Sequence, residues 1–276
     1  MRIDSHQHFW QIADRDGAWP PPSLSAIHRD FVPADLAPAL KRCGIAGTVL
    51  VQSMPSLAET ETLLTIAAAT PFVRGVVGWV DMTRADAAEQ IERLARSPWL
   101  KGLRPMLQDL PDNAWAADPA YYAAAHAMQS RGLVFDALVL PLHLPGLLAF
   151  ARRHPSLPIV IDHAAKPLIA SGASEPWRGE IAELAALPNL QCKISGLLTE
   201  AGPNADAARL APYVDHLFAC FGAQRLMWGS DWPVLELAAD YDAWFAMATR
   251  LCRSRTDAAG MAAIFGANAR RFYNLD

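Results

Sequence analysis

The sequence has little net charge and few cysteines, and each scarcity excludes a class of protein. Its 24 Lys and Arg residues are balanced by 28 Asp and Glu residues, which gives a net charge of −4. Because there is no excess of positive charge to neutralise phosphates or an anionic membrane, we expect no nucleic-acid partner. The four cysteines lie far apart, and no two of them form a CxxC pair. We therefore interpret them as reduced thiols of a cytoplasmic protein.

Long apolar runs are also missing. The first residues become polar within four positions, so they lack the apolar core of a signal peptide. The longest apolar stretch, residues 137–151, is interrupted by two prolines and a histidine and is shorter than the roughly 20 residues that cross a bilayer. We expect no membrane insertion. With 52% apolar and 19% charged residues, the chain has ample material for a globular core.

Short runs rich in Val, Ile and Leu alternate with longer segments of helical period, a pattern typical of repeated strand–helix units on a parallel sheet. The expected strands are Arg2–His6, Thr48–Ser53, Val73–Val80, Lys101–Met106, Leu133–Leu138, Ile159–His163, Leu190–Ser195 and Leu226–Ser230. The helical segments between them include Leu57–Thr70, Arg84–Ser97, Tyr121–Arg131, Leu144–His154, Glu180–Leu187 and Ala205–Phe221. Eight such units predict an α/β fold, a (β/α)₈ TIM barrel that forms a single domain over residues 1–276.

An open doubly wound sheet is the alternative fold. It is disfavoured because His-Phe-Trp, and not a glycine-rich turn, follows the first strand, so the chain has no dinucleotide-binding fingerprint. A proline-rich patch, Trp19–Pro22, lies in the long connection after this strand. We interpret the patch as a lid or rim over the active site.

Candidate catalytic side chains follow the strands of the predicted barrel, whose carboxyl ends all open on one face. Residues two apart on a strand share a face, so we expect Asp4, His6 and His8 to point into the barrel mouth together. The alternative for the two histidines is a loop cap and a solvated side chain. His163 ends the sixth expected strand and adds a third imidazole to the same rim. Asp231 follows the eighth, where it is a candidate catalytic base or, alternatively, a helix N-cap.

Three cationic residues accompany these groups. Arg104 ends the fourth expected strand and could orient a substrate oxygen, stack on a tryptophan or form a surface ion pair. Lys193 lies among apolar residues of the seventh, where an unpaired charge is costly, so it could also pair with Asp162 or Asp136. Lys166 follows His163 at the same rim. We interpret all three lysine and arginine side chains as candidate substrate contacts.

Five short motifs together resemble the amidohydrolase superfamily, and more narrowly its L-fuconolactonase-like and L-rhamnonolactonase-like sugar lactonases. They are HxH at 6–8, DHxxKP at 162–167, CKISGL at 192–197, GSDWP at 229–233 and FGANA at 265–269. The resemblance implies a (β/α)₈ barrel that hydrolyses a cyclic ester. It also implies that His6 and His8 are the first-strand pair, His163 the sixth-strand histidine and Asp231 the eighth-strand aspartate.

Two departures from the superfamily pattern concern the metal. Metal-dependent members usually carry a bridging Lys or Glu at the fourth strand and a histidine at the fifth, where this sequence has Arg104 and Asp136. A binuclear site is therefore not expected. The remaining metal-ligand candidates, His6, His8, His163 and Asp231, could hold one Zn²⁺. They could equally form a polar site for which a metal is dispensable.

These residues lead to a mechanistic hypothesis. Asp231 removes a proton from the water that attacks a lactone carbonyl, while His8 and His163, with His6, polarise that carbonyl directly or through a metal. The strand-end cations are too few for a multiply charged substrate, and Trp10 and Trp232 suit the apolar faces of a sugar. We expect a neutral six-carbon or 6-deoxy L-sugar lactone, such as L-fuconolactone or L-rhamnonolactone.

Three alternatives stay open at this point. The protein could hydrolyse a carboxylated pyrone or another aromatic-derived lactone, or it could be a decarboxylase of the same superfamily. It could also be a barrel that binds sugars without catalysis. The sequence does not indicate whether the barrels form homo-oligomers.

Overall fold

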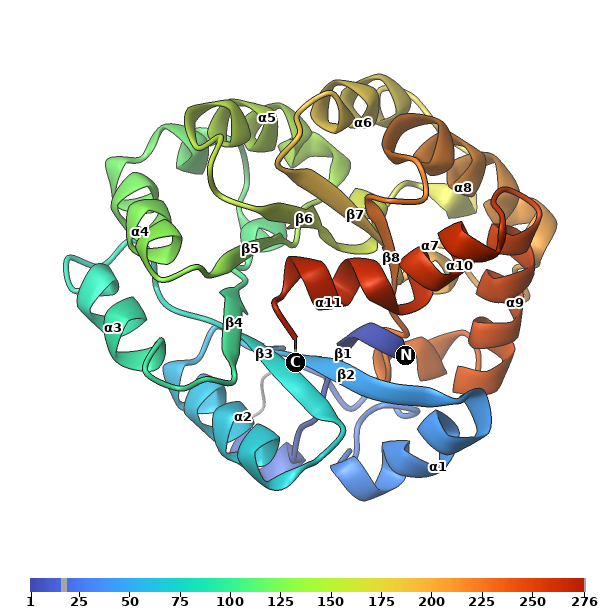
Figure 1. Ribbon diagram of the computed structural model, residues 1–276, viewed down its shortest axis with the longest axis horizontal. Helices are drawn as coiled ribbons and strands as arrows, with labels where there is room; N and C mark the ends of the chain where they lie inside the picture. Colours follow the sequence, from blue (N-terminus) through green and yellow to red (C-terminus); the bar gives the residue numbers. More distant parts are fainter. Residues whose placement is uncertain (16–18, 276) are drawn as a thin grey trace.

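Eight parallel strands in chain order form the centre of the protein, which we describe from a computed structural model of residues 1–15 and 19–275 (Figure 1). The strands are β1 (Arg2–Gln7), β2 (Ile45–Val51), β3 (Val73–Gly78), β4 (Leu100–Leu103), β5 (Val134–Ala137), β6 (Ile159–Ile161), β7 (Leu190–Ile194) and β8 (Leu226–Trp228). The last strand meets the first through two backbone hydrogen bonds, Asp231 N to His6 O at 2.8 Å and His8 N to Trp232 O at 2.7 Å. The sheet therefore closes into the predicted (β/α)₈ barrel, and the doubly wound alternative is excluded.

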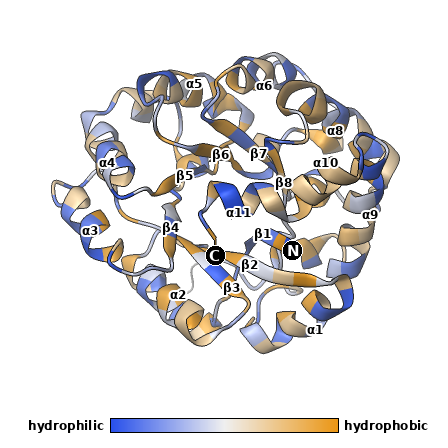
Figure 2. Ribbon diagram, viewed as in Figure 1, coloured by the Kyte–Doolittle hydropathy of each residue, from blue (hydrophilic) through white to orange (hydrophobic). Residues whose placement is uncertain are grey.

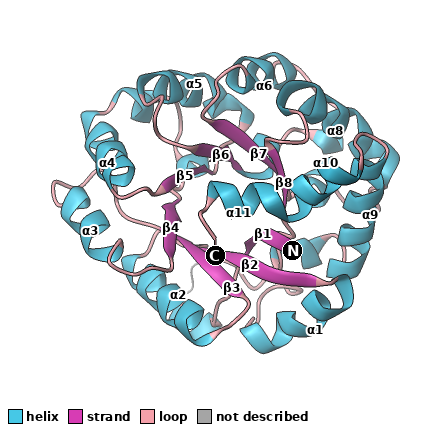
Figure 3. Ribbon diagram, viewed as in Figure 1, coloured by secondary structure: helices cyan, strands magenta, loops and turns pink. Residues whose placement is uncertain are grey.

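A ring of helices surrounds the strands (Figure 3). The helices are α1 (Pro33–Cys43), α2 (Leu57–Ala69), α3 (Ala87–Leu94), α4 (Pro119–Ser130), α5 (Leu144–Arg153), α6 (Trp177–Ala185), α7 (Leu197–Ala201), α8 (Ala207–Phe221), α9 (Tyr241–Arg253), α10 (Ala258–Ala262) and α11 (Asn268–Phe272). The last of them, α11, is not part of the ring. Several begin at side-chain caps, such as Ser56 before α2 and Asp206 before α8. Hydrophilic residues lie beside hydrophobic ones on most of these helices (Figure 2), as expected where one side packs on the barrel.

The described helices include none that is both long and apolar enough to span a membrane.

The barrel interior is lined by large apolar side chains, most of them β-branched. They are Ile3, Val49, Val51, Val77, Val134, Val160 and Met227. Such side chains favour extended backbone and fill the space between facing strands. This packing explains why the short Val- and Ile-rich runs of the sequence predict the strands correctly.

The C-terminal segment closes the amino end of the barrel. In the view of Figure 1, α11 lies in front of the strands, and both chain termini lie beside it. Four side chains of this segment pack on the interior residues of the strands; we call Ala269, Phe272, Tyr273 and Leu275 the C-terminal plug. Asn268 secures it by donating hydrogen bonds to the carbonyls of Ala223 at 2.8 Å and Leu226 at 2.6 Å. The FGANA motif, residues 265–269, thus lies where the chain enters α11.

Seven of the eight strands end earlier than predicted, and β1 ends one residue later, at Gln7. For example, β6 ends at Ile161, whereas we expected extended backbone to His163, and β8 ends at Trp228 and not at Ser230. The backbone turns left-handed at His163 and at Asp231, with φ of 52° and 59°. These turns carry two of the predicted functional residues.

Candidate active site

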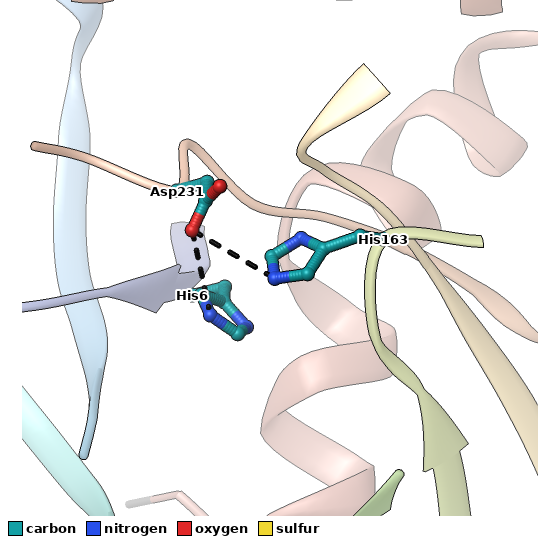
Figure 4. Close-up of side chains that lie close together, drawn as sticks. All are labelled: His6, His163 and Asp231. Atoms are coloured by element: carbon teal, nitrogen blue, oxygen red, sulfur yellow. Dashed lines mark ion pairs between the residues drawn. The ribbon is translucent and has the colours of Figure 1, made fainter. Parts of the chain in front are cut away.

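Three imidazoles and one carboxylate meet at the carboxyl end of the barrel. His6 lies at the end of β1, His8 follows it, His163 follows β6 and Asp231 follows β8. Asp231 Oδ1 lies 3.3 Å from His8 Nε2, 3.7 Å from His6 Nε2 and 3.8 Å from His163 Nε2. Figure 4 shows the side chains of His6 and His163 directed at the Asp231 carboxylate. The structure thus brings together residues from the first, sixth and last strands of the barrel.

The fifth residue expected in the mouth, Asp4, does not reach it. Its Oδ1 accepts hydrogen bonds from the backbone N–H of Ser230 at 2.8 Å and of His6 at 3.1 Å. Its Oδ2 accepts one from the hydroxyl of Tyr241, a residue of α9, at 2.9 Å. The prediction fails because the pairing of β1 with β2 is irregular between Asp4 and Gln7, which breaks the two-residue alternation. Burial raises the pKa of Asp4 to about 6, although its hydrogen bonds oppose the shift.

The turn that carries His163 is strained. Four consecutive residues that are not glycine, His163 to Lys166, have φ between 50° and 61°. Left-handed backbone costs such residues about 1–2 kcal/mol each, and strain of this kind is typical of functional sites. The Trp177 indole holds the turn by donating to the Ala164 carbonyl at 2.7 Å. Gly196 is required beside it, because a Cβ at that position would lie 2.7 Å from His163 Nδ1.

Left-handed backbone also positions Asp231. Its φ of 59° turns the carboxylate toward the histidines, and the helical turn that follows, Val234–Leu237, has no side-chain cap from it. The alternative role of Asp231 as a helix N-cap is therefore not adopted.

Each histidine is oriented through its far ring nitrogen. His8 Nδ1 donates to the Val51 carbonyl at 2.7 Å, and His163 Nδ1 is hydrogen-bonded to Ser195 Oγ at 2.9 Å. His6 Nδ1 instead faces the Lys193 ammonium at 3.1 Å. All three rings therefore present Nε2 to the space in front of Asp231. Metal-binding histidines are commonly oriented in this way, through a hydrogen bond at the nitrogen that does not face the ion.

Burial sets the charges of the site. It lowers the pKa of His6 well below its ordinary value and that of His163 to about 4, so both rings are neutral near pH 7. Burial alone would raise the pKa of Asp231, but His163, a hydrogen bond from His8 and the proximity of His6 lower it below its ordinary value. Neutral imidazoles beside an ionised carboxylate are the protonation states that bind a divalent metal.

The donor set also fits a metal geometrically. One ligand atom from each of His6, His163 and Asp231 lies within 4.8 Å of the other two, and all three residues are buried. His8 Nε2 lies 3.2 Å from His6 Nε2 and can add a fourth donor. Nitrogen and carboxylate oxygen ligands in this number suit Zn²⁺. The part of the chain described therefore contains a three-residue candidate metal site.

A second charged cluster lies immediately below this site. Lys193 is fully buried and pairs with both alternatives considered from the sequence, Asp136 Oδ2 at 2.6 Å and Asp162 Oδ1 at 2.9 Å. Tyr273 of the C-terminal plug donates to the same Asp136 oxygen at 2.7 Å. Both contacts use the same oxygen of Asp136, so this carboxylate is held by Lys193 and Tyr273.

Arg104 connects the two clusters. Its guanidinium donates to the Gln52 carbonyl and lies 3.3 Å from both Asp162 Oδ2 and His6 Nε2. Burial alone would raise the pKa of Asp162, but Lys193, His6 and Arg104 hold it well below the ordinary value. Arg104 therefore links the carbonyl of Gln52, the carboxylate of Asp162 and the ring of His6 at the floor of the site.

A pocket of about 260 Å³ opens in front of the imidazoles. Its lining residues are His8, Trp19, Ser53, Met54, Pro55, Arg104, Met106, Gln108, Asp109, Leu138, His163, Lys166, Asp231 and Val234. Five predicted site residues are among them. Lys166 extends across one side and donates to Gln108 Oε1 at 2.8 Å.

Three predicted substrate contacts do not line this pocket within the described chain. Trp10 is 5% exposed and donates its indole N–H to the Arg29 carbonyl, while Trp232 is 4% exposed and donates to Glu236. Lys193 is enclosed below the floor. The polar group of each of these side chains therefore already has a partner within the protein. The aromatic residue that does reach the pocket is Trp19, in the proline-rich patch interpreted as a rim.

Nothing in the sequence marks the other lining residues as part of a binding site. Met54, Met106 and Val234 look like ordinary core residues in the sequence, and Gln108 is one polar residue in a loop. They reach the pocket because each follows the carboxyl end of a strand. The position of the strand ends could have indicated them, but their residue types could not.

Fold and site together define a barrel enzyme that has one candidate metal centre among its described residues. A model of the amidohydrolase family matches residues 3–275, and the chain belongs to this family. An L-fucono-1,5-lactonase from Burkholderia ambifaria is 55% identical, over 100% of this chain and 96% of that protein. A second L-fucono-1,5-lactonase, from Burkholderia multivorans, is 38% identical over the same shares. A solved structure of a Burkholderia multivorans amidohydrolase with bound Zn is 36% identical and superposes with a TM-score of 0.94 over 100% of both chains.

Proposed function

We propose that this protein is a sugar lactonase that hydrolyses L-fucono-1,5-lactone to the open-chain acid. The observation that carries the proposal is the identity of 55% along the whole chain to a protein named for this activity. The site supports it, because an ionised carboxylate faces the pocket beside neutral imidazoles and a guanidinium. A neutral lactone also suits a pocket whose wall includes Met54, Met106 and Val234.

The reaction needs one proton transfer in each direction. Asp231 accepts a proton from water as the water oxygen attacks the lactone carbonyl, and the bond between that carbon and the ring oxygen then breaks. Asp231 returns the proton to the ring oxygen, which leaves as a hydroxyl group. General-base catalysis of this kind contributes about 10²–10⁴-fold.

The pocket cations and histidines stabilise the charge that develops on the carbonyl oxygen. His8, His163 and Arg104 all line the pocket beside Asp231 and can direct polar groups at that oxygen. Preorganised groups of this kind contribute about 10²–10³-fold. An alkoxide leaves a lactone more readily than an amine leaves an amide, so these two contributions suffice for a lactone.

A divalent ion, for which we propose Zn²⁺, would be held by His6, His163 and Asp231, with His8 beside them. When bound it would supply a Lewis acid that polarises the carbonyl and lowers the pKa of water. A related structure with bound Zn supports this assignment. Metal content, and turnover before and after chelation, test whether the ion is required or dispensable.

The substrate is tested by initial rates on a panel of lactones. We expect the highest kcat/KM with L-fucono-1,5-lactone, lower values with L-rhamnonolactone and other aldonolactones, and none with a carboxylated pyrone. Release of CO₂ from an aromatic acid would instead indicate a decarboxylase, and binding without hydrolysis would indicate a sugar-binding barrel. Either result, or a preference for the pyrone, would overturn the proposal. A cytoplasmic location stays a prediction, and the oligomeric state stays open.

A further inference from the structure

One buried ion pair ties together the pocket walls that follow β1 and β2. Arg15 lies after β1, is 4% exposed and donates from Nη1 to Glu59 Oε1 at 3.3 Å. Its Nη2 donates to Ser53 Oγ at 3.0 Å, and its Nε donates to the Trp19 carbonyl. Because the planar guanidinium holds its donors in fixed directions, these three contacts fix the position of each partner.

Glu59 holds the second of these walls. It lies in the first turn of α2, and its Oε2 accepts hydrogen bonds from the backbone N–H of Ser53 at 3.0 Å and of Met54 at 2.8 Å. Its Oε1 accepts one from the Ser53 hydroxyl at 2.8 Å in addition to that from Arg15. Ser53, Met54 and Trp19 all line the pocket. The pair of Arg15 and Glu59 therefore links the wall formed by Trp19 to the wall formed by Met54.

Trp19 is the exposed member of a pair of indoles. It is 36% exposed, whereas Trp10 behind it is 5% exposed, and the two rings meet edge to face with their centroids 5.3 Å apart. The guanidinium carbon of Arg15 lies 5.2 Å from the Trp10 ring and 5.9 Å from the Trp19 ring, within the range of a cation–π contact. Aromatic side chains that line ligand pockets offer a flat apolar surface to the ligand. Trp19 therefore offers such a surface to the C–H groups of a sugar ring.

We propose that Trp19 contacts the sugar ring of the substrate and that Arg15 is a positioning residue, which together with Glu59 holds Trp19 in place at the pocket. An indole has no group that acts as acid or base near neutral pH. Its contact should therefore strengthen the binding of substrate and transition state alike, and its loss should raise KM more than it lowers kcat. The inference rests on the proposed function for its substrate, but the position of Trp19 can be measured without one.

The first measurement compares the kinetics of Trp19→Ala and Trp19→Phe with those of the unmodified protein on L-fucono-1,5-lactone. We expect Trp19→Ala to raise KM about 10-fold and to change kcat by less than about three-fold, because uniform binding alone is lost. Trp19→Phe keeps an aromatic face and should recover most of this loss. An unchanged KM in Trp19→Ala, or a loss confined to kcat, would overturn the contact.

The second measurement tests the positioning role with the double variant Arg15→Met, Glu59→Gln. It removes both charges of the pair, leaves the net charge unchanged and keeps an acceptor for the two backbone N–H groups that Glu59 binds. We expect a rise in KM of about the same factor as in Trp19→Ala, and little further rise when the three changes are combined, because residues that act as a unit are not additive.

A matched control removes an ion pair of the same kind from the outer surface. Glu61 lies on α2, as Glu59 does, and accepts a hydrogen bond from Arg93 Nη1 at 2.7 Å, where both side chains are exposed. The KM of Glu61→Gln, Arg93→Met should equal that of the unmodified protein. An equal KM in the Arg15→Met, Glu59→Gln variant, or a loss that adds fully to that of Trp19→Ala, would overturn the positioning role.

The third measurement needs no substrate, so it separates this inference from the proposed function. After labelling with 5-fluorotryptophan, the ¹⁹F signals of Trp19 and Trp10 are identified by their loss in Trp19→Phe and Trp10→Phe. We expect the relaxation rates of Trp19 to match those of the buried Trp10 in the unmodified protein, and to report faster motion in the Arg15→Met, Glu59→Gln variant. A freely moving Trp19 in the unmodified protein would overturn the proposal, even if the double variant does not fold. A fixed Trp19 in a protein that hydrolyses no lactone would support the positioning role and overturn the proposed function together with the sugar contact.

Discussion

The two ends of the barrel contain opposite kinds of chemistry. At the carboxyl end, two imidazoles and a carboxylate line a pocket, a third imidazole, that of His6, is buried beside them, and left-handed backbone carries two of these four groups. At the amino end, the C-terminal plug packs apolar side chains on the interior of the strands. The mouth contains groups that are strained and open to a ligand, whereas the plug contains groups whose interactions are all with the protein. The groups available for catalysis therefore lie at one end of the barrel, and a cluster that contributes to stability lies at the other. Variants at the carboxyl end should mainly lower kcat, and variants in the plug should mainly lower the free energy of unfolding.

The largest expected effect is at the mouth. Asp231→Asn removes the proton acceptor and should lower kcat by about 10²–10⁴-fold with the fold intact. Steady-state kinetics and circular dichroism of the purified variant measure the two quantities. Turnover near that of the unmodified protein would contradict the assignment of Asp231 as the base.

The plug should show the reverse pattern. Phe272→Ala removes a buried aromatic ring and should lower the free energy of unfolding by about 3 kcal/mol. Its kcat should stay within about two-fold, because no contact of Phe272 reaches the mouth in the described structure. Denaturant unfolding and kinetics at a temperature where the variant is folded check both points. A selective loss of kcat would break the separation between the two ends.

A buried aspartate that serves the fold sharpens the comparison with Asp231. Asp4 has a pKa raised to about 6, so the folded state holds its proton between about pH 4 and 6 while the unfolded state releases it. Its contribution to stability is therefore greatest below about pH 4 and is lost as the pH rises to about 6. Asn at this position keeps an acceptor for the two backbone N–H groups and does not ionise.

We therefore expect Asp4→Asn to gain about 2 kcal/mol relative to the unmodified protein between pH 4 and pH 7. Urea unfolding of both proteins at each pH measures the difference, in which titration of other groups cancels. A difference independent of pH would show that Asp4 is ionised throughout.

The smallest expected effect compares two lysines at opposite ends. Lys166→Met removes a cation from the pocket wall and should raise KM several-fold, with a smaller effect on kcat, equivalent to about 1 kcal/mol of binding. Lys101→Met is the matched control, because Lys101 donates to the Asn274 carbonyl near the plug. Equal KM values for both variants would remove Lys166 from the substrate contacts.

The sequence is sufficient to predict the barrel and the four residues of its centre. Interior positions such as Val49 and Val160 produce the short β-branched runs, and His6, His163 and Asp231 lie at the ends of such runs or just after them. Strand ends of a parallel barrel meet on one face, so the spacing of these residues along the chain is enough to group them.

Other features depend on geometry that residue types do not encode. Alternation wrongly places Asp4 in the mouth, because the irregular pairing of β1 leaves no mark in the residue pattern. Tryptophan is a residue type that often contacts sugars, which is why the sequence suggests Trp10 and Trp232. In the structure, however, their indole N–H groups donate hydrogen bonds within the protein, to Arg29 and Glu236. The sequence leaves open whether Lys193 contacts substrate or forms an ion pair. The tertiary structure decides, because its buried ammonium points at Asp136 and Asp162.

The positions of the two termini have a practical consequence for handling the protein. Met1 is 65% exposed, whereas Leu275 is 4% exposed and belongs to the plug. An affinity tag or surface linker on the amino terminus should leave the packing intact, while one fused after the last residues would extend from a buried segment. Both termini lie beside α11 at the amino end of the barrel (Figure 1), whereas the pocket residues follow the carboxyl ends of the strands. Immobilisation through the amino terminus would therefore leave the mouth facing solution.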